Sequence, residues 1–96
     1  MNVIIPLSQH PNQIFDVALN GQYCTITLLQ RTTGLFFGLS LNGIKIADSV
    51  HCQNNQPVIF PDYRGFKGTI RFIDRQSNDN PTWDGLGTRY ELRYAS

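Results

Sequence analysis

The sequence predicts an all-β protein that folds as a small antiparallel barrel or a two-sheet sandwich of about six to eight short strands. Turn chemistry is the first observation, because Asn20-Gly21 and Asn42-Gly43 each lie between apolar-rich runs. Asn-Gly supplies two residues that tolerate positive φ, as the type I′ turn of a β-hairpin requires. The second observation is the alternation of apolar and polar residues along these runs, the period of a strand with one buried face. Helical periodicity over three turns occurs nowhere in the chain.

The first half of the chain contains five such runs. Val3 and Ile5 form a short run before Pro6, which lacks an amide hydrogen and therefore indicates an edge or terminal strand. The next three runs are expected to point the following residues inward: Phe15, Val17 and Leu19; Cys24, Ile26 and Leu28; and Leu35, Phe37, Leu39 and Leu41. Thr32-Thr33-Gly34 provides the turn between the last two, and Ile44 and Ile46 follow the second Asn-Gly turn.

The second half is less regular. Residues 53–57 (QNNQP) form a polar loop, and residues 58–60 (VIF) form a short run that Pro61 closes. Ile70 and Phe72 alternate with polar neighbours in a clear strand, and residues 76–81 (QSNDNP) predict a surface loop. The last predicted strand has Tyr90, Leu92 and Tyr94 on one face.

Composition limits the classes of function. A chain of 96 residues has the size of one domain, so we expect a single β domain over residues 1–96. The charged fraction is only 16%, as expected of a subunit that packs against other proteins, and equally of a thinly charged monomer. A formal net charge of +1 argues against a dominant electrostatic attraction to nucleic acid or acidic lipid.

The sequence shows no targeting segment and has only two cysteines. Residues 1–6 (MNVIIP) lack a basic segment, and their apolar run is too short for a signal peptide or a membrane span. We therefore expect a cytoplasmic protein without a membrane partner. In that reducing compartment Cys24 and Cys52 are expected to be free thiols, with a Cys24–Cys52 disulfide as the alternative.

No motif in the chain carries recognisable catalytic chemistry. The seven carboxylates fall mostly at strand ends or turns, where Asp typically bonds its own backbone. His51 and Cys52, even together with Cys24, are too few and wrongly spaced for a metal site. The serines lack a nucleophile-elbow context, and the glycines match no phosphate-binding loop. We expect no enzymatic activity, no cofactor and no metal.

Candidate interface residues come from outward aromatics and turn-rich loops. Phe36 has the opposite parity to Leu35 and Phe37, so it faces outward, where it packs under a loop or contacts another protein. Tyr63 and Arg64 lie in one turn-rich segment and Trp83 in another, and rigid aromatics in surface loops can anchor a partner. Phe66 and Leu86, from the same two segments, are expected to fill the open end of a small barrel instead.

Arginines on the last strands suggest a second kind of partner. Arg71, Arg89 and Arg93 are expected on outward positions, as in a barrel that binds oligonucleotides. Tyr90 and Tyr94 alternate with them and face the other side, and together with the small net charge this argues against nucleic acid as a ligand. Arg89 and Arg93 are kept as interface candidates, and a small β-barrel that binds an oligonucleotide or a carbohydrate is the alternative function.

Several segments together have the order and spacing of a known family. They are Ile4-Ile5-Pro6-Leu7, Asn12-Gln13-Ile14-Phe15, Leu19-Asn20-Gly21-Gln22, residues 31–37 (RTTGLFF), Leu41-Asn42-Gly43 and residues 85–92 (GLGTRYEL). With these segments the chain resembles the small baseplate plug proteins of contractile-tailed bacteriophages. The resemblance covers nearly the whole chain and supplies no catalytic residues.

The resemblance implies a structural subunit of the virion, located in the tail baseplate and assembled in the host cytoplasm. A plug-like protein of this family sits at the central tail tip, near the tube, hub and spike. Its implied partners are those baseplate proteins, and a homo-oligomer within the assembly is compatible with this role.

Overall fold

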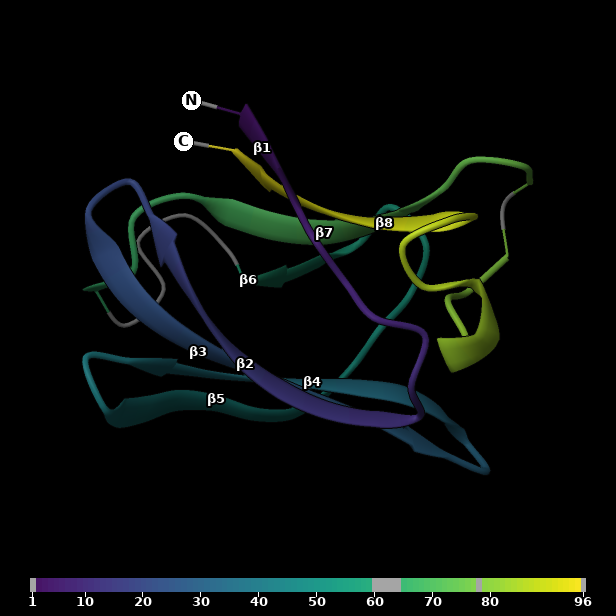
Figure 1. Ribbon diagram of the computed structural model, residues 1–96, viewed down its shortest axis with the longest axis horizontal. Coiled ribbons are helices and arrows are strands. Elements are labelled where there is room, and N and C mark those ends of the chain that lie inside the picture. The colour runs from purple at the N-terminus through teal and green to yellow at the C-terminus, as the bar shows by residue number, and fades with distance from the viewer. Residues whose placement is uncertain (1, 60–64, 78, 96) are drawn as a thin grey trace.

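Two four-stranded antiparallel sheets packed face to face make up the computed structural model, which describes residues 2–59, 65–77 and 79–95 (Figure 1). The all-β prediction is therefore confirmed. The elements in chain order are β1 (Asn2–Ile5), β2 (Asn12–Leu19), β3 (Gln22–Arg31), β4 (Gly34–Leu41), β5 (Ile44–His51), β6 (Pro57–Ile59), β7 (Thr69–Asp74), the short 3-10 turn η2 (Trp83–Gly85) and β8 (Tyr90–Ala95).

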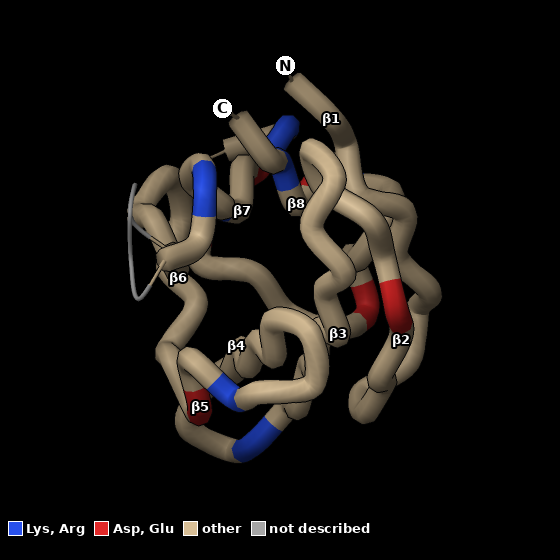
Figure 2. Tube along the Cα trace, turned by 90° about the vertical axis from the view of Figure 1, so that its left-hand side faces the viewer, with Lys and Arg blue, Asp and Glu red and all other residues tan. Residues whose placement is uncertain are grey.

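The two sheets have different connectivity. Strands β2-β3-β4-β5 follow one another through consecutive hairpins, and we call this layer the hairpin sheet. The other layer, with the order β1-β8-β7-β6, holds both ends of the chain and is called the terminal sheet. Since the described strands pair only within their own sheet, they do not close into the small barrel that was the first expectation, and the fold is the two-sheet sandwich that was the second. Figure 2 shows the two layers from the side.

The Asn-Gly turns have the conformation that the sequence predicts. Asn20 and Gly21 have φ values of 52° and 78°, and Asn42 and Gly43 have values of 52° and 83°. Both residues of each pair are thus in the left-handed region that a type I′ turn needs. The strands on either side pair in register, Leu19 with Gln22 and Leu41 with Ile44, so each loop has only the two central residues.

The core lies between the sheets and consists of the residues whose parity predicts burial. Phe15, Val17 and Leu41 are half-buried, and the other inward positions of β3, β4, β7 and β8 are buried. Phe66 and Leu86 are also fully buried in this core, so they fill the space between two sheets rather than a barrel mouth. Buried members of the core include Ile5, Leu19, Cys24, Ile26, Leu28, Leu35, Phe37, Leu39, Ile70, Phe72, Tyr90, Leu92 and Tyr94.

Strand β5 departs from regular alternation because it is bulged. Its pairing with β4 shifts on both sides of Leu39, and Ser49 has a φ of 53°. As a result Ile46 and Ala47 are both buried although they are adjacent, whereas Ile44 is exposed. Bulges insert residues that a period-two pattern does not anticipate.

One side chain joins the two sheets at the end of the sandwich beside the first Asn-Gly turn. The Gln22 side chain accepts a hydrogen bond from the Lys67 backbone N–H at 2.8 Å and donates to the Lys67 carbonyl at 3.0 Å. Tyr94 of the terminal sheet donates its hydroxyl to the same carbonyl at 2.6 Å. Gln22 thus holds the β2–β3 turn against the segment that leads into β7.

Both cysteines lie in the interior. Cys24 and Cys52 are buried free thiols, as expected, and burial raises the pKa of both. Across residues 2–59, 65–77 and 79–95, no helix has the length and apolar character needed to cross a membrane.

Candidate protein-interaction surface

Phe36 lies on the outer face of the hairpin sheet, as its parity predicts. It is half-buried, and in register it lies between Leu29 of β3 and His51 of β5. Its ring centroid is 5.3 Å from that of His51, and the Arg31 guanidinium lies 5.8 Å from the Phe36 centroid. Phe36 therefore packs among side chains of its own sheet face and is only partly covered by them.

Other apolar residues extend this face. Ile14 on the edge strand β2 is 69% exposed, and Leu29 lies between β2 and Phe36. Next to Leu29 and Phe36, Gly38 leaves a hollow of about 110 Å³. Sequence reasoning missed Ile14, although the alternation that turns Phe15 inward also turns Ile14 outward.

Trp83 lies on η2, at the end of the sandwich opposite the Gln22 bridge. The turn is held from two sides, because the Trp83 backbone N–H donates to the Gln30 side chain at 3.0 Å and the Gln9 side chain donates to the Asp84 carbonyl at 2.8 Å. Trp83 is nevertheless 38% exposed. A fixed backbone beneath an exposed indole is the arrangement of an anchor residue, because little conformational entropy is lost when a partner covers the ring.

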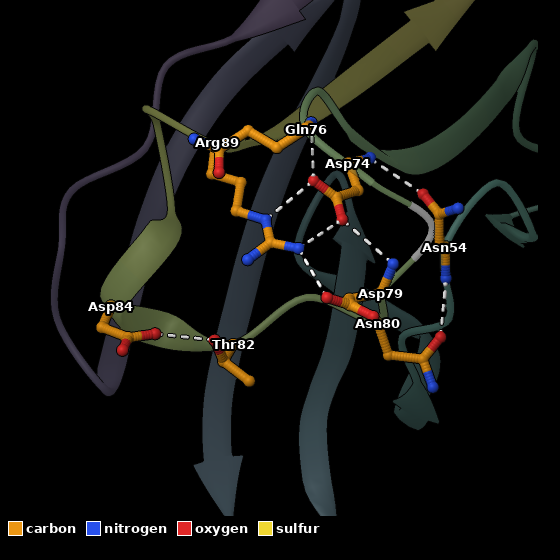
Figure 3. Close-up of polar contacts among 8 residues, drawn as sticks. All are labelled: Asn54, Asp74, Gln76, Asp79, Asn80, Thr82, Asp84 and Arg89. Carbon is orange, nitrogen blue, oxygen red and sulfur yellow. Dashed lines mark hydrogen bonds and ion pairs between the residues drawn. The ribbon is translucent and has the colours of Figure 1, made fainter.

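The expectation that Arg89 occupies an outward strand position is wrong. Arg89 immediately precedes β8, and its side chain turns toward Asp74 at the end of β7 (Figure 3). The Arg89 Nε and Nη2 atoms donate to the two Asp74 carboxylate oxygens at 2.9 and 2.8 Å, and Nη2 also reaches Asp79 at 2.6 Å. The side chain of Arg89 is only 27% exposed, so most of its hydrogen-bonding capacity is used inside the protein.

Asp74 is the buried centre of this cluster. Its carboxylate accepts hydrogen bonds from the backbone N–H groups of Gln76 at 2.9 Å and Asp79 at 3.0 Å, in addition to Arg89. These donors, above all the Arg89 guanidinium, hold the pKa of Asp74 well below its usual range, and the carboxylates raise the pKa of Arg89. Asp74 therefore caps a turn, as expected of the carboxylates, and also closes a salt bridge that the sequence analysis did not predict.

The neighbouring loop residues complete the polar cluster that Figure 3 shows. The Asn54 side chain accepts from the Asp74 backbone N–H at 2.8 Å, and the Asn54 backbone N–H donates to the Asn80 side chain at 3.0 Å. The cluster thus fastens the long β7–β8 connection to the segment before β6. Asp74 continues the buried parity of Ile70 and Phe72, which is the signal that marks it as an inward carboxylate in need of a cation.

Arg93 and Arg71 do face outward, from the terminal sheet. They are direct cross-strand partners in the antiparallel pairing of β8 with β7. Arg93 is 48% exposed in its side chain and forms an ion pair with Glu91 at 2.7 Å. Tyr90 and Tyr94 face the core, as predicted.

The other residues that the sequence analysis singled out do not extend any of these surfaces. Tyr63 and Arg64 lie outside the described residues. His51 faces outward beside Phe36, whereas Cys52 is buried in the core, so these neighbours point to different environments. The structure therefore places the four described candidates apart: Phe36 on one outer face, Arg93 on the other, Trp83 at one end, and Arg89 in the salt bridge with Asp74.

The sequence also matches the model of a known protein family. The model of a family described as "Cyanophage baseplate Pam3 plug gp18" matches residues 2–96. No curated protein matches the chain. Because the match includes all eight strands that the structure describes, it concerns the whole fold rather than one segment, and it confirms the resemblance seen in the sequence.

Proposed function

The chain belongs to the family of cyanophage baseplate plug proteins, and on this premise we propose that it is a structural subunit at the central tip of a phage tail. In this role it contacts the tube, hub or spike proteins and joins them during assembly in the host cytoplasm. The family match over residues 2–96 is the observation that carries the proposal.

The surface of the protein supports a role in assembly. Among the described residues, five large apolar side chains are exposed, and they come from both sheets and from η2: Ile4, Ile14, Tyr23, Ile44 and Trp83. Clustered or rigidly held apolar side chains are typical of protein interfaces. Since they lie on several sides of a small sandwich, a subunit surrounded by neighbours is a better fit than a protein with one binding face.

We also propose that the protein is not an enzyme. Asp74 and Arg89 have the most strongly shifted pKa values among the charged side chains that the structure describes, and such groups are the usual candidates for catalysis. Here the two groups neutralise each other, and the Asp74 carboxylate accepts further donors from the backbone. This arrangement keeps both groups charged and serves the loop structure rather than proton transfer.

Quantitative mass spectrometry of purified particles tests the proposal. The chain and the tail-tube subunit are measured against isotope-labelled standards before and after washes in high salt. We expect a small, constant ratio of the chain to the tube subunit that survives the washes. Absence of the chain from the particles, or its loss in salt, would contradict a structural role and favour a free ligand-binding protein.

A further inference from the structure

The outer face of the terminal sheet contains a groove of about 560 Å³, larger than the hollow beside Gly38. Its lining combines two cations with apolar and small polar side chains: Ile4, Asn55, Thr69, Arg71, Ile73 and Arg93. Ile4 is 57% exposed. The groove spans strands β1, β8 and β7, so the sheet itself forms its floor and no loop has to close for it to exist.

The two charges in this groove are both positive and repel each other. Arg71 and Arg93 are directly paired across β7 and β8, and like charges in such pairs destabilise a sheet. Arg93 is partly neutralised by Glu91, whereas Arg71 donates to the neutral side-chain oxygen of Asn55 at 3.2 Å. The described residues that line the groove contribute two positive charges and no carboxylate, although the whole chain has a net charge of only +1.

We propose that this groove binds an extended, carboxylate-bearing segment of a neighbouring baseplate protein. A carboxylate placed between Arg71 and Arg93 accepts hydrogen bonds from both guanidinium groups and removes the repulsion between them. Apolar side chains of the same segment cover Ile4 and Ile73. The inference rests on the proposed function, since it names the surface and the partner chemistry through which the subunit is held.

A protein segment fits the groove better than a nucleic acid does. Proteins that bind single strands stack bases on exposed aromatic rings. Among the described residues that line the groove, the one aromatic is Tyr94, which is buried with its ring in the core. The apolar side chains that the groove offers instead are aliphatic, Val3, Ile4 and Ile73, and these suit the apolar side chains of a protein segment.

The substitution Arg71→Glu separates binding from folding. The introduced carboxylate would lie opposite Arg93 and replace a repulsive pair with an attractive one, so we expect the midpoint of thermal unfolding of the isolated protein to rise by about 1 to 5 °C. The same change gives the groove a negative charge where the partner needs a positive one. Incorporation into particles, measured as the ratio to the tube subunit, is expected to fall at least about tenfold, equivalent to the loss of one charge-assisted hydrogen bond.

Two further variants control for the change in net charge and for the reversal of charge at position 71. Arg75→Glu has the same charge change on an exposed residue just beyond β7, and it is expected to incorporate as the wild type does. Arg71→Gln removes the charge without reversing it, and it is expected to unfold no lower than the wild type while incorporating less. Untagged protein is required, because Asn2 pairs with Ala95 at one end of the groove and a tag on either terminus would lie there.

Photo-crosslinking identifies the occupant. A photoreactive amino acid replaces Ile73 in assembled particles, and the crosslinked peptide is sequenced. We expect a peptide of another baseplate protein with Asp or Glu close to the crosslinked residue. A crosslink to DNA, a crosslink to a second copy of this chain, or no crosslink would each overturn the inference, as would normal incorporation of Arg71→Glu. If the wild-type chain itself is missing from the particles, the proposed function fails instead.

Discussion

At the scale of single residues, Asp74 is expected to contribute most to the response of the protein to acid. The pKa of its carboxylate is held low by Arg89 and by backbone N–H groups, and the side chain is buried. A group whose pKa is lower in the folded state stabilises the fold above its unfolded-state pKa of about 4 and loses that effect as the pH falls further. The contribution of Asp74 to stability should therefore be constant near neutral pH and decline below about pH 4.

The variant Asp74→Asn tests this dependence. It leaves Arg89 without its main buried partner, so we expect a lower unfolding midpoint at pH 7 and a smaller difference from the wild type at pH 3. Thermal unfolding between pH 3 and pH 7 measures both effects. Asp48→Asn is the matched control, at an exposed carboxylate 3.7 Å from the Lys45 ammonium group, and it should follow the wild-type curve. Parallel curves for wild type and Asp74→Asn would show that the Asp74 carboxylate does not control acid stability.

Phe36 and Phe37 are adjacent residues with opposite environments. Phe37 is fully buried, whereas Phe36 lies on the outer face beside His51. We expect Phe36→Ala to change the free energy of unfolding by no more than about 1 kcal/mol, because only cross-strand contacts are lost. Phe37→Ala should cost about 3 to 5 kcal/mol, because it opens a cavity in the core.

Denaturant unfolding measures the two free energies, and quantitation in particles measures incorporation. Phe36→Ala is expected to fold normally and to incorporate poorly. A loss of stability comparable with that of Phe37→Ala would assign Phe36 to the core, and normal incorporation would remove it from the interface.

At the scale of elements, glycine has two distinct roles in the hairpin sheet. Gly43 has a φ of +83°, and a Cβ added there would meet nothing within 4 Å, so only the backbone conformation opposes a side chain. Gly38 in β4 has an ordinary φ, and its added Cβ would lie 3.5 Å from the Ala47 carbonyl oxygen, a normal contact.

The paired substitutions Gly43→Ala and Gly38→Ala should therefore differ in sign. Gly43→Ala is expected to destabilise the protein by about 1 to 2 kcal/mol, the cost of placing a side chain in the left-handed region. Gly38→Ala should leave stability unchanged or raise it by about 0.5 to 1 kcal/mol, because it lowers the entropy of the unfolded chain. Equilibrium unfolding in urea measures both, and equal losses would show that the β4 backbone does not tolerate a side chain at position 38.

The strands and their inward faces were predictable because they depend on local properties. Asn-Gly turns and alternation act over a few residues, and both give correct boundaries for the β2–β3 and β4–β5 hairpins. The burial of Ile46 beside Ala47 was not predictable, since a bulge breaks the period on which the prediction depends. The exposure of Ile14 follows from the same alternation as that of Phe36 and was therefore predictable from the sequence.

At the scale of the whole molecule, the features that sequence reasoning missed arise from distant pairing. The choice of sandwich over barrel depends on which strands become neighbours after residues 6–11 and 52–56 cross between the sheets. The outer groove exists because β1 pairs with β8, so the first and last strands lie side by side (Figure 1). The Asp74–Arg89 bridge likewise depends on the β7–β8 register. The parity of Asp74 marks it as an inward carboxylate, but no local signal in the sequence identifies its partner or the pairing of β1 with β8.

We propose that this sandwich is a structural part of the tail tip, held through its outer faces. A cryo-electron microscopy reconstruction of the baseplate in purified particles tests it most directly. We expect density for two four-stranded sheets at the centre of the tail tip, with Phe36 and the Arg71–Arg93 groove covered by neighbouring proteins. A baseplate without such density, or one in which both outer faces are open to solvent, would show that the protein is not held in the tail tip in this way.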